Sequence, residues 1–451
     1  MTNAKLREKA FEIIQLFKGK YLNSDGFIAR HYPPKERTIF DNFDDIVPFL
    51  LYFEEHDLLL SQIKLMKEKN EDFLSLCSEY GMIIAREIDE WFGGMYSLWK
   101  ATANEDVYDI LKSSIDFVEK NLIKDDKLSA CYYIEQNKAV KYYEPWSSGL
   151  LETACEMRED FPKFFEKAMQ IMNTWIDDEY FKSYGLFRYR VFDSKLLKRF
   201  QENILAYIKP LYSNSKPPAK IVNGKKNIFK SFVRNVRFNL INGYYSQLMK
   251  SNTTCAFTLL EFYRATNDEK WINALDKWLN SALHKFYSDG KVYSEYIPKI
   301  NKKLKPGATP AFILVDIICD TAYFVPSFKK YLSYAKNIID YYLSNTLSTG
   351  LIPHYEKSNF AHIDNQVDFA VSIRKYMEVS GNEIYKQKVI DLAEAVINEH
   401  YSPNGYFTFS GRVEQNNISP KYNGLFLKNM INFLTIDENI YPKYYDLFKD
   451  R

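Results

Sequence analysis

The sequence is poor in the residues that build disulfide frameworks and transition-metal sites. Its 451 residues include only five cysteines and six histidines. The cysteines are scattered singly, are odd in number and form no Cys-x-x-Cys pair, a usage typical of reduced, buried thiols. The histidines are equally dispersed, without the His/Cys/Asp spacing of a zinc site. We therefore expect no disulfide framework, no bound metal and no other cofactor.

Long uninterrupted apolar runs are also missing. The first ten residues lead into an amphipathic segment rather than the apolar core of a signal peptide. The most apolar stretch, Ala308 to Cys319, contains Pro310 and Asp316 and is much shorter than the ~20 residues that span a bilayer. We expect a protein that is not integral to the membrane and is cytoplasmic, either free or peripheral to the membrane surface.

The formal net charge is only +2, yet one segment is strongly basic. Residues 193–237 carry eleven Lys and Arg against Asp193 and Glu202, a net charge of +9. Between Phe229 and Phe238, apolar residues recur at helical spacing while basic residues mark another face. This pattern predicts a short basic helix that contacts an anionic membrane, or that covers a pocket and attracts an acidic saccharide. A lid with solvated lysines is the plainer alternative. Nucleic acid is not expected, because no recognised binding fold accompanies the charge.

A polar or aromatic cluster followed by a helical apolar pattern recurs along the chain. Most repeats are 55 to 57 residues apart, and the one gap of 107 residues shortens to about 57 without a basic insertion at about 193–245. The first interval is only 45 residues, so six hairpins are favoured and seven are also compatible. We expect a single domain, residues 1–451. Its repeats start at Asp44, Asp89, Trp146, Thr253, Thr309, Asp364 and Lys421.

Each repeat contains two predicted helices, and a glycine with a short aromatic stretch follows them. In the last complete unit the helices cover residues 364–379 and 382–401. The first helix of several pairs is almost wholly apolar and the second is amphipathic, as expected for an inner helix enclosed by an outer one. Glycine suits the left-handed end of a helix, and alternating aromatics suit a short strand. The Gly-aromatic stretches begin at Gly26, Gly185, Gly290, Gly350 and Gly405.

This repeat of inner helix, outer helix and Gly-aromatic strand resembles the six-hairpin (α/α) toroid superfamily of glycoside hydrolases, unsaturated-uronyl hydrolases, polysaccharide lyases and sugar epimerases. The likeness covers nearly the whole chain apart from the basic insertion. It lies in architecture, and the motif of no single family is present. It implies an all-α fold, an (α/α) toroid of helical hairpins with short strands at one mouth. In such a toroid the inner helices start at a common mouth, so residues far apart in sequence face one pocket.

Glycosidic cleavage usually needs two carboxylates, one that donates a proton to the leaving oxygen and one that activates water or attacks directly. The densest acidic group at a predicted mouth is Asp41, Asp44 and Asp45. Pro48 follows and is tolerable only where a helix has just begun. Capping by one aspartate, with the others solvated, is the simpler explanation. A metal-binding acidic motif of the terpenoid-synthase kind is weaker, because a second acidic motif is missing.

The next predicted start brings together Glu87, Asp89 and Glu90 with Trp91 and twin glycines. An aromatic face beside carboxylates suits a sugar ring, and glycines within a helix indicate a close approach to the backbone. Tight helix packing with surface acids is the alternative.

A third candidate, Glu144, stands between Tyr143 and Trp146, directly before an inner helix. Burial among aromatics would favour the protonated carboxyl that a general acid needs, so Glu144 is the preferred proton donor. An exposed loop glutamate is the alternative.

The fourth candidate, Asp364, begins another inner helix, where capping is the commoner role. Upstream of it, His354 and Tyr355 suit contacts to sugar hydroxyls, or base and acid roles in a lyase or epimerase. Glu295 occupies a similar strand position and is a weaker candidate.

Together these residues favour a carbohydrate-active enzyme, foremost a metal-independent glycoside hydrolase of an oligosaccharide or polysaccharide, with acidic or lipid-linked glycans as candidate substrates. A polysaccharide lyase or uronyl C5-epimerase would instead remove a proton beside a sugar carboxylate. A non-catalytic glycan-binding or scaffold protein would use the mouth for recognition alone. The expected catalytic set is Asp41, Asp44, Asp45, Glu87, Asp89, Glu144 and Asp364. The expected substrate-binding set is Arg30, His31, Trp91, Tyr143, Trp146, Tyr296, His354 and Tyr355.

Overall fold

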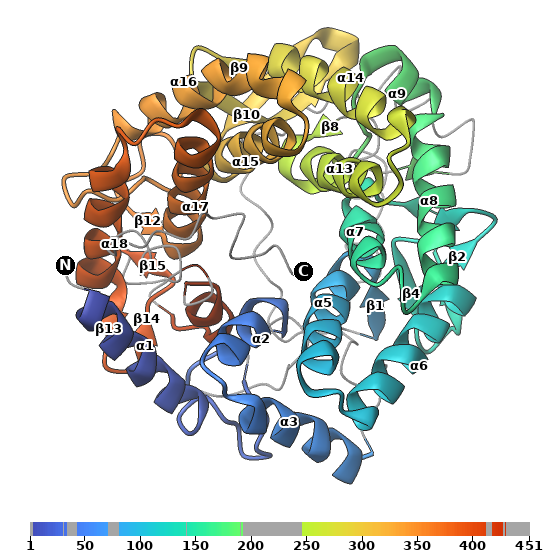
Figure 1. Cartoon of the computed structure of the whole chain (residues 1–451), viewed down its shortest axis with the longest axis vertical. Coiled ribbons are helices and arrows are strands. Elements are labelled where there is room, and N and C mark those ends of the chain that lie inside the picture. Colours follow the sequence, from blue (N-terminus) through green and yellow to red (C-terminus); the bar gives the residue numbers. More distant parts are fainter. Residues whose placement is uncertain are drawn as a thin grey trace, which may run out of the picture.

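The computed structural model describes residues 3–29, 31–33, 43–70, 81–140, 142–189, 191–192, 246–411, 417–426 and 429. Its helices form two concentric rings, an inner and an outer one, around a central axis (Figure 1). Within the described residues, no helix has both the length and the apolar character needed to cross a membrane. The basic insertion and its helix between Phe229 and Phe238 lie outside the described residues, so its membrane contact remains a prediction.

Six helical hairpins follow one another in the described part of the chain, each with an inner and an outer helix (Figure 1). Six of the seven repeat starts predicted from the sequence lie at, or within two turns of, the beginning of an inner helix. The hairpins are α2 (Phe43–Tyr52) with α3 (His56–Glu68), α5 (Ala85–Thr102) with α6 (Glu105–Asn121), α7 (Gly149–Glu156) with α8 (Pro162–Ile176), α13 (Thr254–Thr266) with α14 (Glu269–Phe286), α15 (Ala308–Phe324) with α16 (Leu332–Leu343), and α17 (Ile363–Ser380) with α18 (Lys386–His400). A short helix, α9 (Glu179–Tyr184), follows α8.

The two ends of the chain fill the remaining position of the ring (Figure 1). Residues 420–426 form a helical segment on the inside, which begins at the seventh predicted start, and α1 (Asn3–Phe17) lies on the outside. Gly424 is so close to α2 that a Cβ there would lie 2.7 Å from Ile46 Cγ1. The Tyr401 hydroxyl donates a hydrogen bond to Glu12, which joins the end of α18 to α1. The ring therefore has six continuous hairpins and a closing pair made from both chain ends.

Burial separates the inner from the outer helices as the hydrophobic pattern predicts. Helix α15 is buried around most of its circumference, whereas α16 buries only Ala335, Ile338, Ile339 and Tyr342, which share one face. The four described cysteines are buried free thiols, as expected.

Short strands lead directly into the inner helices and so mark one mouth of the ring. Five strands have this place: β1 (Met82–Ile84) before α5, β6 (Tyr142–Tyr143) before α7, β8 (Ser246–Gln247) before α13, β11 (Lys302–Pro306) before α15 and β12 (Ala361–His362) before α17. Their antiparallel partners are β4 (Cys131–Tyr133), β7 (Val191–Phe192), β10 (Lys291–Ile297) and β15 (Phe409–Ser410), with β10 between β8 and β11. The predicted strands at one mouth are thus confirmed.

The glycines of the five Gly-aromatic stretches all adopt positive φ, between +63° and +114°. In three units the backbone that follows the glycine is held by a buried amide side chain near the start of an inner helix. The amide oxygen accepts the N–H of a residue in the stretch and the amide nitrogen donates to the C=O of the same residue. The pairs are Asn252 with Phe187 (2.9 and 3.1 Å), Gln366 with Ile352 (2.7 and 2.9 Å), and Asn423 with Tyr406 (2.8 and 3.4 Å).

Gly290 offers a test of this geometry. At its φ of +82°, an added Cβ would lie 2.6 Å from Tyr341 Cβ and 2.8 Å from Asn337 O. We expect Gly290→Ala to lower the free energy of unfolding by about 2–4 kcal/mol, the sum of left-handed strain and overpacking. Gly381→Ala is the matched control, because its φ is +70° and no atom lies within 4 Å of the added Cβ. It should lose only the strain, about 1–2 kcal/mol. Equal losses in chemical denaturation would contradict the packing at Gly290.

Candidate functional site

An acidic group surrounds one lysine at the strand-bearing mouth of the ring. Lys421, from the closing segment 420–426, places its Nζ 2.6 Å from Glu90 Oε2 on α5 and 3.7 Å from Asp45 Oδ2 on α2. Glu90 keeps 30% of its side-chain surface accessible, so a small molecule can reach it. Three separate units of the ring therefore meet at one ammonium group.

Helix α17 adds two carboxyl groups, Asp364 and Asp368, which lie one turn apart on one face. Asp364 interacts electrostatically with both Asp45 and Lys421. We call Asp45, Glu90, Asp364 and Asp368, with Lys421 among them, the acidic cluster. All of its members lie in the first two turns of their helices.

Burial sets different protonation states within the acidic cluster. It raises the pKa of Glu90 to about 8, although the Lys421 ammonium acts in the opposite direction. It raises the pKa of Asp364 to about 6, and the nearby Asp45 charge adds to the effect. The pKa of Asp368 also lies well above its usual range, because of burial and the neighbouring carboxylates. At neutral pH the cluster therefore contains both protonated and ionised carboxyl groups.

A buried ion group continues from the acidic cluster between α15 and α17. Lys375 Nζ lies 2.8 Å from Asp320 Oδ2 and 3.5 Å from Asp316 Oδ2. The Ser372 hydroxyl donates to Asp316 Oδ1 at 2.6 Å. These contacts place one ammonium between the two aspartates and join α15 to α17.

Two histidines line the mouth where α17 begins. Capping was the plainer alternative to the catalytic role expected of Asp364, but His362 caps this helix, since its Nδ1 accepts the Asp364 N–H at 3.2 Å. The Asp364 carboxyl is therefore not used as the cap. Burial lowers the pKa of His362 to about 3, so its ring is neutral. The His354 ring stacks 5.3 Å from it, with Nδ1 3.3 Å from Asn365 Nδ2.

Another sector of the mouth holds Trp146, in the 3-10 turn η2 (Pro145–Ser148) before α7. Arg86, in the first turn of α5, lies over its indole at 4.0 Å from the ring centroid. Glu144 is only 2% exposed, which agrees with its expected burial, and its Oε2 lies 3.7 Å from Arg86. Asp89 belongs to this sector too, because a Cβ at Gly149 would lie 2.0 Å from Asp89 Oδ2. The absent side chain at Gly149 lets α5 approach the start of α7.

Trp91 and Tyr296 require corrections. Trp91 is fully buried and donates from Nε1 to Ser114 Oγ of α6 at 3.4 Å. It lies one position after Glu90 and therefore faces the outer helix. Its indole is not accessible to a sugar. Tyr296 is 5% exposed, and its hydroxyl donates to Asn301 Oδ1 at 2.9 Å within the sheet. Both residues support the fold rather than a binding surface.

The remaining expected residues lie around the rim or beyond the described residues. Glu87 Oε1 is 3.6 Å from Arg86, and Lys127 lies 5.6 Å from the Tyr143 ring centroid. His31 and Tyr355 are exposed. Arg30, Asp41 and the side chain of Asp44 lie outside the described residues.

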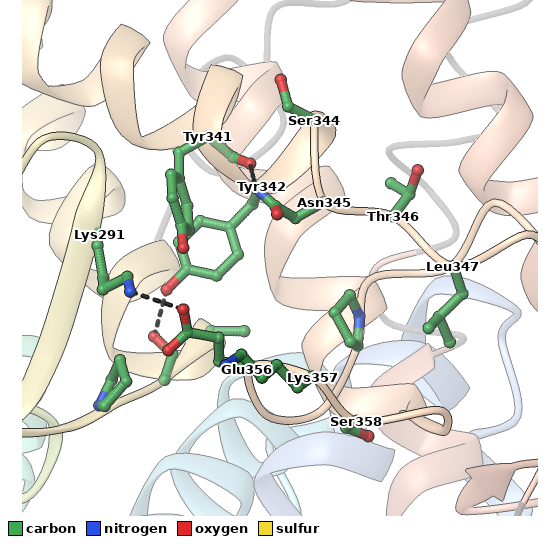
Figure 2. A pocket seen from close by; sticks show the side chains of 14 residues that line it. Lys291, Tyr341, Tyr342, Ser344, Asn345, Thr346, Leu347, Glu356, Lys357 and Ser358 are labelled. Carbon is green, nitrogen blue, oxygen red and sulfur yellow. Dashed lines mark hydrogen bonds and ion pairs between the residues drawn. The ribbon is translucent and has the colours of Figure 1, made fainter.

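A hollow of about 410 Å³ lies between the end of α16 and the loop that leads to α17 (Figure 2). None of its lining residues belongs to the acidic cluster. Lys291 Nζ binds Glu356 Oε1 at 2.6 Å, and the Tyr342 hydroxyl donates to the Gly307 carbonyl at 2.7 Å. Glu356 is the one carboxylate that lines the hollow, so the paired carboxylates of a hydrolytic site are missing there.

The described residues contain no group of three or more His, Cys, Asp or Glu placed to hold a metal ion. The metal-free chemistry expected from the sequence remains a prediction.

Comparison with known proteins links the chain to others through its structure. No family model and no curated protein matches the sequence. The structure is similar to that of an α-1,2-mannosidase from Trichoderma reesei, with a TM-score of 0.66 and 8% identity over 97% of this chain and 93% of that one. It is also similar to a D-mannose isomerase, with a TM-score of 0.59 and 8% identity over 95% and 97% of the chains. A cellobiose 2-epimerase from Bacillus thermoamylovorans gives 0.57 and 9% identity over 96% and 100%.

At 8 to 9% identity these likenesses concern the fold, and they extend over nearly the full length of each chain. They confirm the architecture that the repeat predicts. The chain has the (α/α) toroid fold that is shared by glycoside hydrolases and sugar epimerases.

Proposed function

We propose that the protein is a glycoside hydrolase that cleaves its substrate by acid and base catalysis at the acidic cluster, without a metal. The observation that carries this proposal is that carboxyl groups from three units of the ring, Asp45, Glu90 and Asp364, meet around Lys421 at the strand-bearing mouth, where 30% of the Glu90 side chain is accessible. The raised pKa values of Glu90, about 8, and of Asp364, about 6, support a proton donor and a base near pH 7. Glycosidic cleavage requires such a donor and such a base beside one bond.

In this mechanism Glu90 donates its proton to the glycosidic oxygen as the bond from that oxygen to the anomeric carbon breaks. The bonding electron pair stays on the departing oxygen. The Asp364 carboxylate takes a proton from a water molecule whose oxygen attacks the anomeric carbon. The Lys421 ammonium, 2.6 Å away, supports the negative charge that Glu90 acquires.

Glu144 was expected to be the proton donor, and we assign it another role. It is 2% exposed and lies 3.7 Å from Arg86, beside Trp146, whereas Glu90 is accessible and lies in the acidic cluster. We therefore assign Glu144 the positioning of Arg86, which with Trp146 would contact the substrate.

A second candidate function is a sugar epimerase or isomerase, and the His354 imidazole at the mouth favours it. A neutral imidazole can take a proton from a carbon atom beside a carbonyl group. The structural similarity to a D-mannose isomerase and a cellobiose 2-epimerase is compatible with this chemistry. A lyase or uronyl C5-epimerase would use the same kind of proton transfer beside a sugar carboxylate.

Incubation with a panel of oligosaccharides in ¹⁸O-labelled water tests the proposal. The panel contains manno-oligosaccharides, uronate-containing chains and polyprenyl-linked glycans. Hydrolysis gives one new reducing end for each bond cleaved, with one labelled oxygen. An epimerase leaves every glycosidic bond intact, and a lyase gives an unsaturated product without the label. Binding without turnover of any member would show a recognition protein and defeat the proposal.

A further inference from the structure

Two cations from different units of the ring lie against the indole of Trp146. Arg86 of α5 lies 4.0 Å from its ring centroid. Lys250 belongs to the π-helix η4 (Leu248–Thr253), and its Nζ lies 4.6 Å from the same centroid. Such π-helical turns are rare and occur often at functional sites. Three units therefore supply one aromatic face and two positive groups.

The charges in this sector are not evenly matched. Arg86 has Glu144 at 3.7 Å and Glu87 at 3.6 Å, distances that leave the guanidinium loosely held. The nearby Glu295, 2% exposed, pairs with Lys305 at 2.9 Å. Lys250, in contrast, makes no ion pair within 4 Å and no hydrogen bond with any residue that the structure describes.

Lys250 is only partly accessible, and its surroundings disfavour its charge. Burial, and next the Arg86 charge, lower its pKa, while Glu144 and Glu295 act in the opposite direction from a distance. Holding a second cation at this place is unfavourable unless an anion joins it. Lys250 therefore has no direct counterion among the described residues, although carboxylates lie nearby.

We propose that Arg86 and Lys250 bind an anionic group carried by the saccharide, while the Trp146 indole contacts the sugar ring. Guanidinium and ammonium groups both donate to carboxylate and phosphate oxygens, and the guanidinium can do so with two parallel hydrogen bonds. The anionic group is the carboxylate of a uronic acid or a phosphate ester. This inference rests on the proposed function, because it places the anionic group at the same mouth as the acidic cluster.

Isothermal titration calorimetry of the full-length protein with three monosaccharides tests the inference. D-Glucose, D-glucuronate and glucose 6-phosphate differ in charge on one sugar frame, and none has a glycosidic bond to cleave. We expect at least one of the two anions to bind ten or more times more tightly than glucose. The tighter of the two identifies the carboxylate or the phosphate as the natural group.

The variants Lys250→Met and Arg86→Gln should each reduce this preference about tenfold, and Lys250→Arg should keep most of it. Lys270→Met is the matched control, because its ammonium also lies over a tryptophan, 4.4 Å from the centroid of Trp271, but on the outer helix α14. Thermal denaturation confirms that each variant is folded.

The inference is overturned if the wild type shows no preference for either anion over glucose, or if Lys270→Met removes the preference as fully as Lys250→Met. Its failure is distinct from that of the proposed function. Anion binding without cleavage of any oligosaccharide would remove the hydrolase and leave the anion site. Cleavage of neutral chains without anion preference would support the hydrolase and remove the anion site.

Discussion

Glu90→Gln lowers kcat/KM for the cleaved saccharide by about 100- to 10,000-fold, the usual contribution of a positioned general acid. Glutamine keeps the shape of the side chain but has no proton to give to the leaving oxygen. Steady-state kinetics measures the loss, and circular dichroism shows that the variant is folded. Glu105→Gln, an exposed position at the start of the outer helix α6, is the matched control and should keep full activity. Wild-type rates in Glu90→Gln would exclude Glu90 as the acid.

The dependence of the rate on pH is a second test of Asp364 and Glu90. The rate should rise as Asp364 ionises through about pH 6 and fall as Glu90 loses its proton through about pH 8, which gives a bell. Asp364→Asn should remove the acidic limb from the activity that remains. A single limb that neither variant shifts would refute the assignment.

The same shifts fix the direction of the stability change with pH. Folded Glu90 keeps its proton up to about pH 8, whereas the unfolded chain releases it near the ordinary glutamate pKa of 4.5. The folded state therefore binds more protons between these values. The contribution of Glu90 to stability is greatest below pH 4.5 and is lost as the pH rises to 8. Glu90→Gln should flatten this part of the curve of melting temperature against pH.

Asn252→Ala should destabilise the fold by about 3 kcal/mol or more, because it leaves several buried groups without partners. The Asn252 amide holds both backbone groups of Phe187, and its oxygen also accepts Trp278 Nε1–H at 3.1 Å. Its nitrogen donates to Gln247 O at 2.9 Å, which anchors the turn that carries Lys250. The loss is therefore large compared with the total stability of a typical domain.

Chemical denaturation measures this loss. The control is Asn280→Ala on α14, where an exposed amide donates to Asp276 O at 2.8 Å. That change should alter stability by no more than about 0.5 kcal/mol. Similar losses at Asn252 and Asn280 would show that the buried amide does not hold the Phe187 stretch.

The repeat was predictable because each unit must bury the same kind of inner helix. The interval locates the beginnings of α15 and α17 from Thr309 and Asp364. The glycines have positive φ, but while Gly185 ends a helix, Gly290 and Gly405 lie at hairpins between short strands. The buried amides were not found, because an isolated Asn or Gln looks like a surface residue in sequence. Their recurrence near the inner-helix starts is the signal that would have revealed them.

The place of the candidate site, at the starts of the inner helices, was predicted better than the residues that form it. Near the start of α5, Asp89 and Trp91 were among the predicted site residues. It is Glu90, between them, that lies with Asp45 at Lys421. One position along a helix rotates a side chain by about 100°, so neighbours in sequence face different surroundings. Arg86 and Glu90 are one helical turn apart, so they lie on the same face of α5, and this spacing indicates which of the neighbouring acids faces the mouth. Lys421 marked a repeat start, but its role as a counterion depends on how the ring closes.

The closing pair has a consequence for when the protein becomes active. Tyr401 and Glu12, which join across the seam, are 389 residues apart in the chain. Joining such distant segments costs more entropy than adding a neighbouring hairpin. The acidic cluster straddles this seam, with Asp45 on one side and Lys421 on the other. If the acidic cluster is the catalytic site, as proposed, we expect activity only after residue 421 has been synthesised and has joined Asp45.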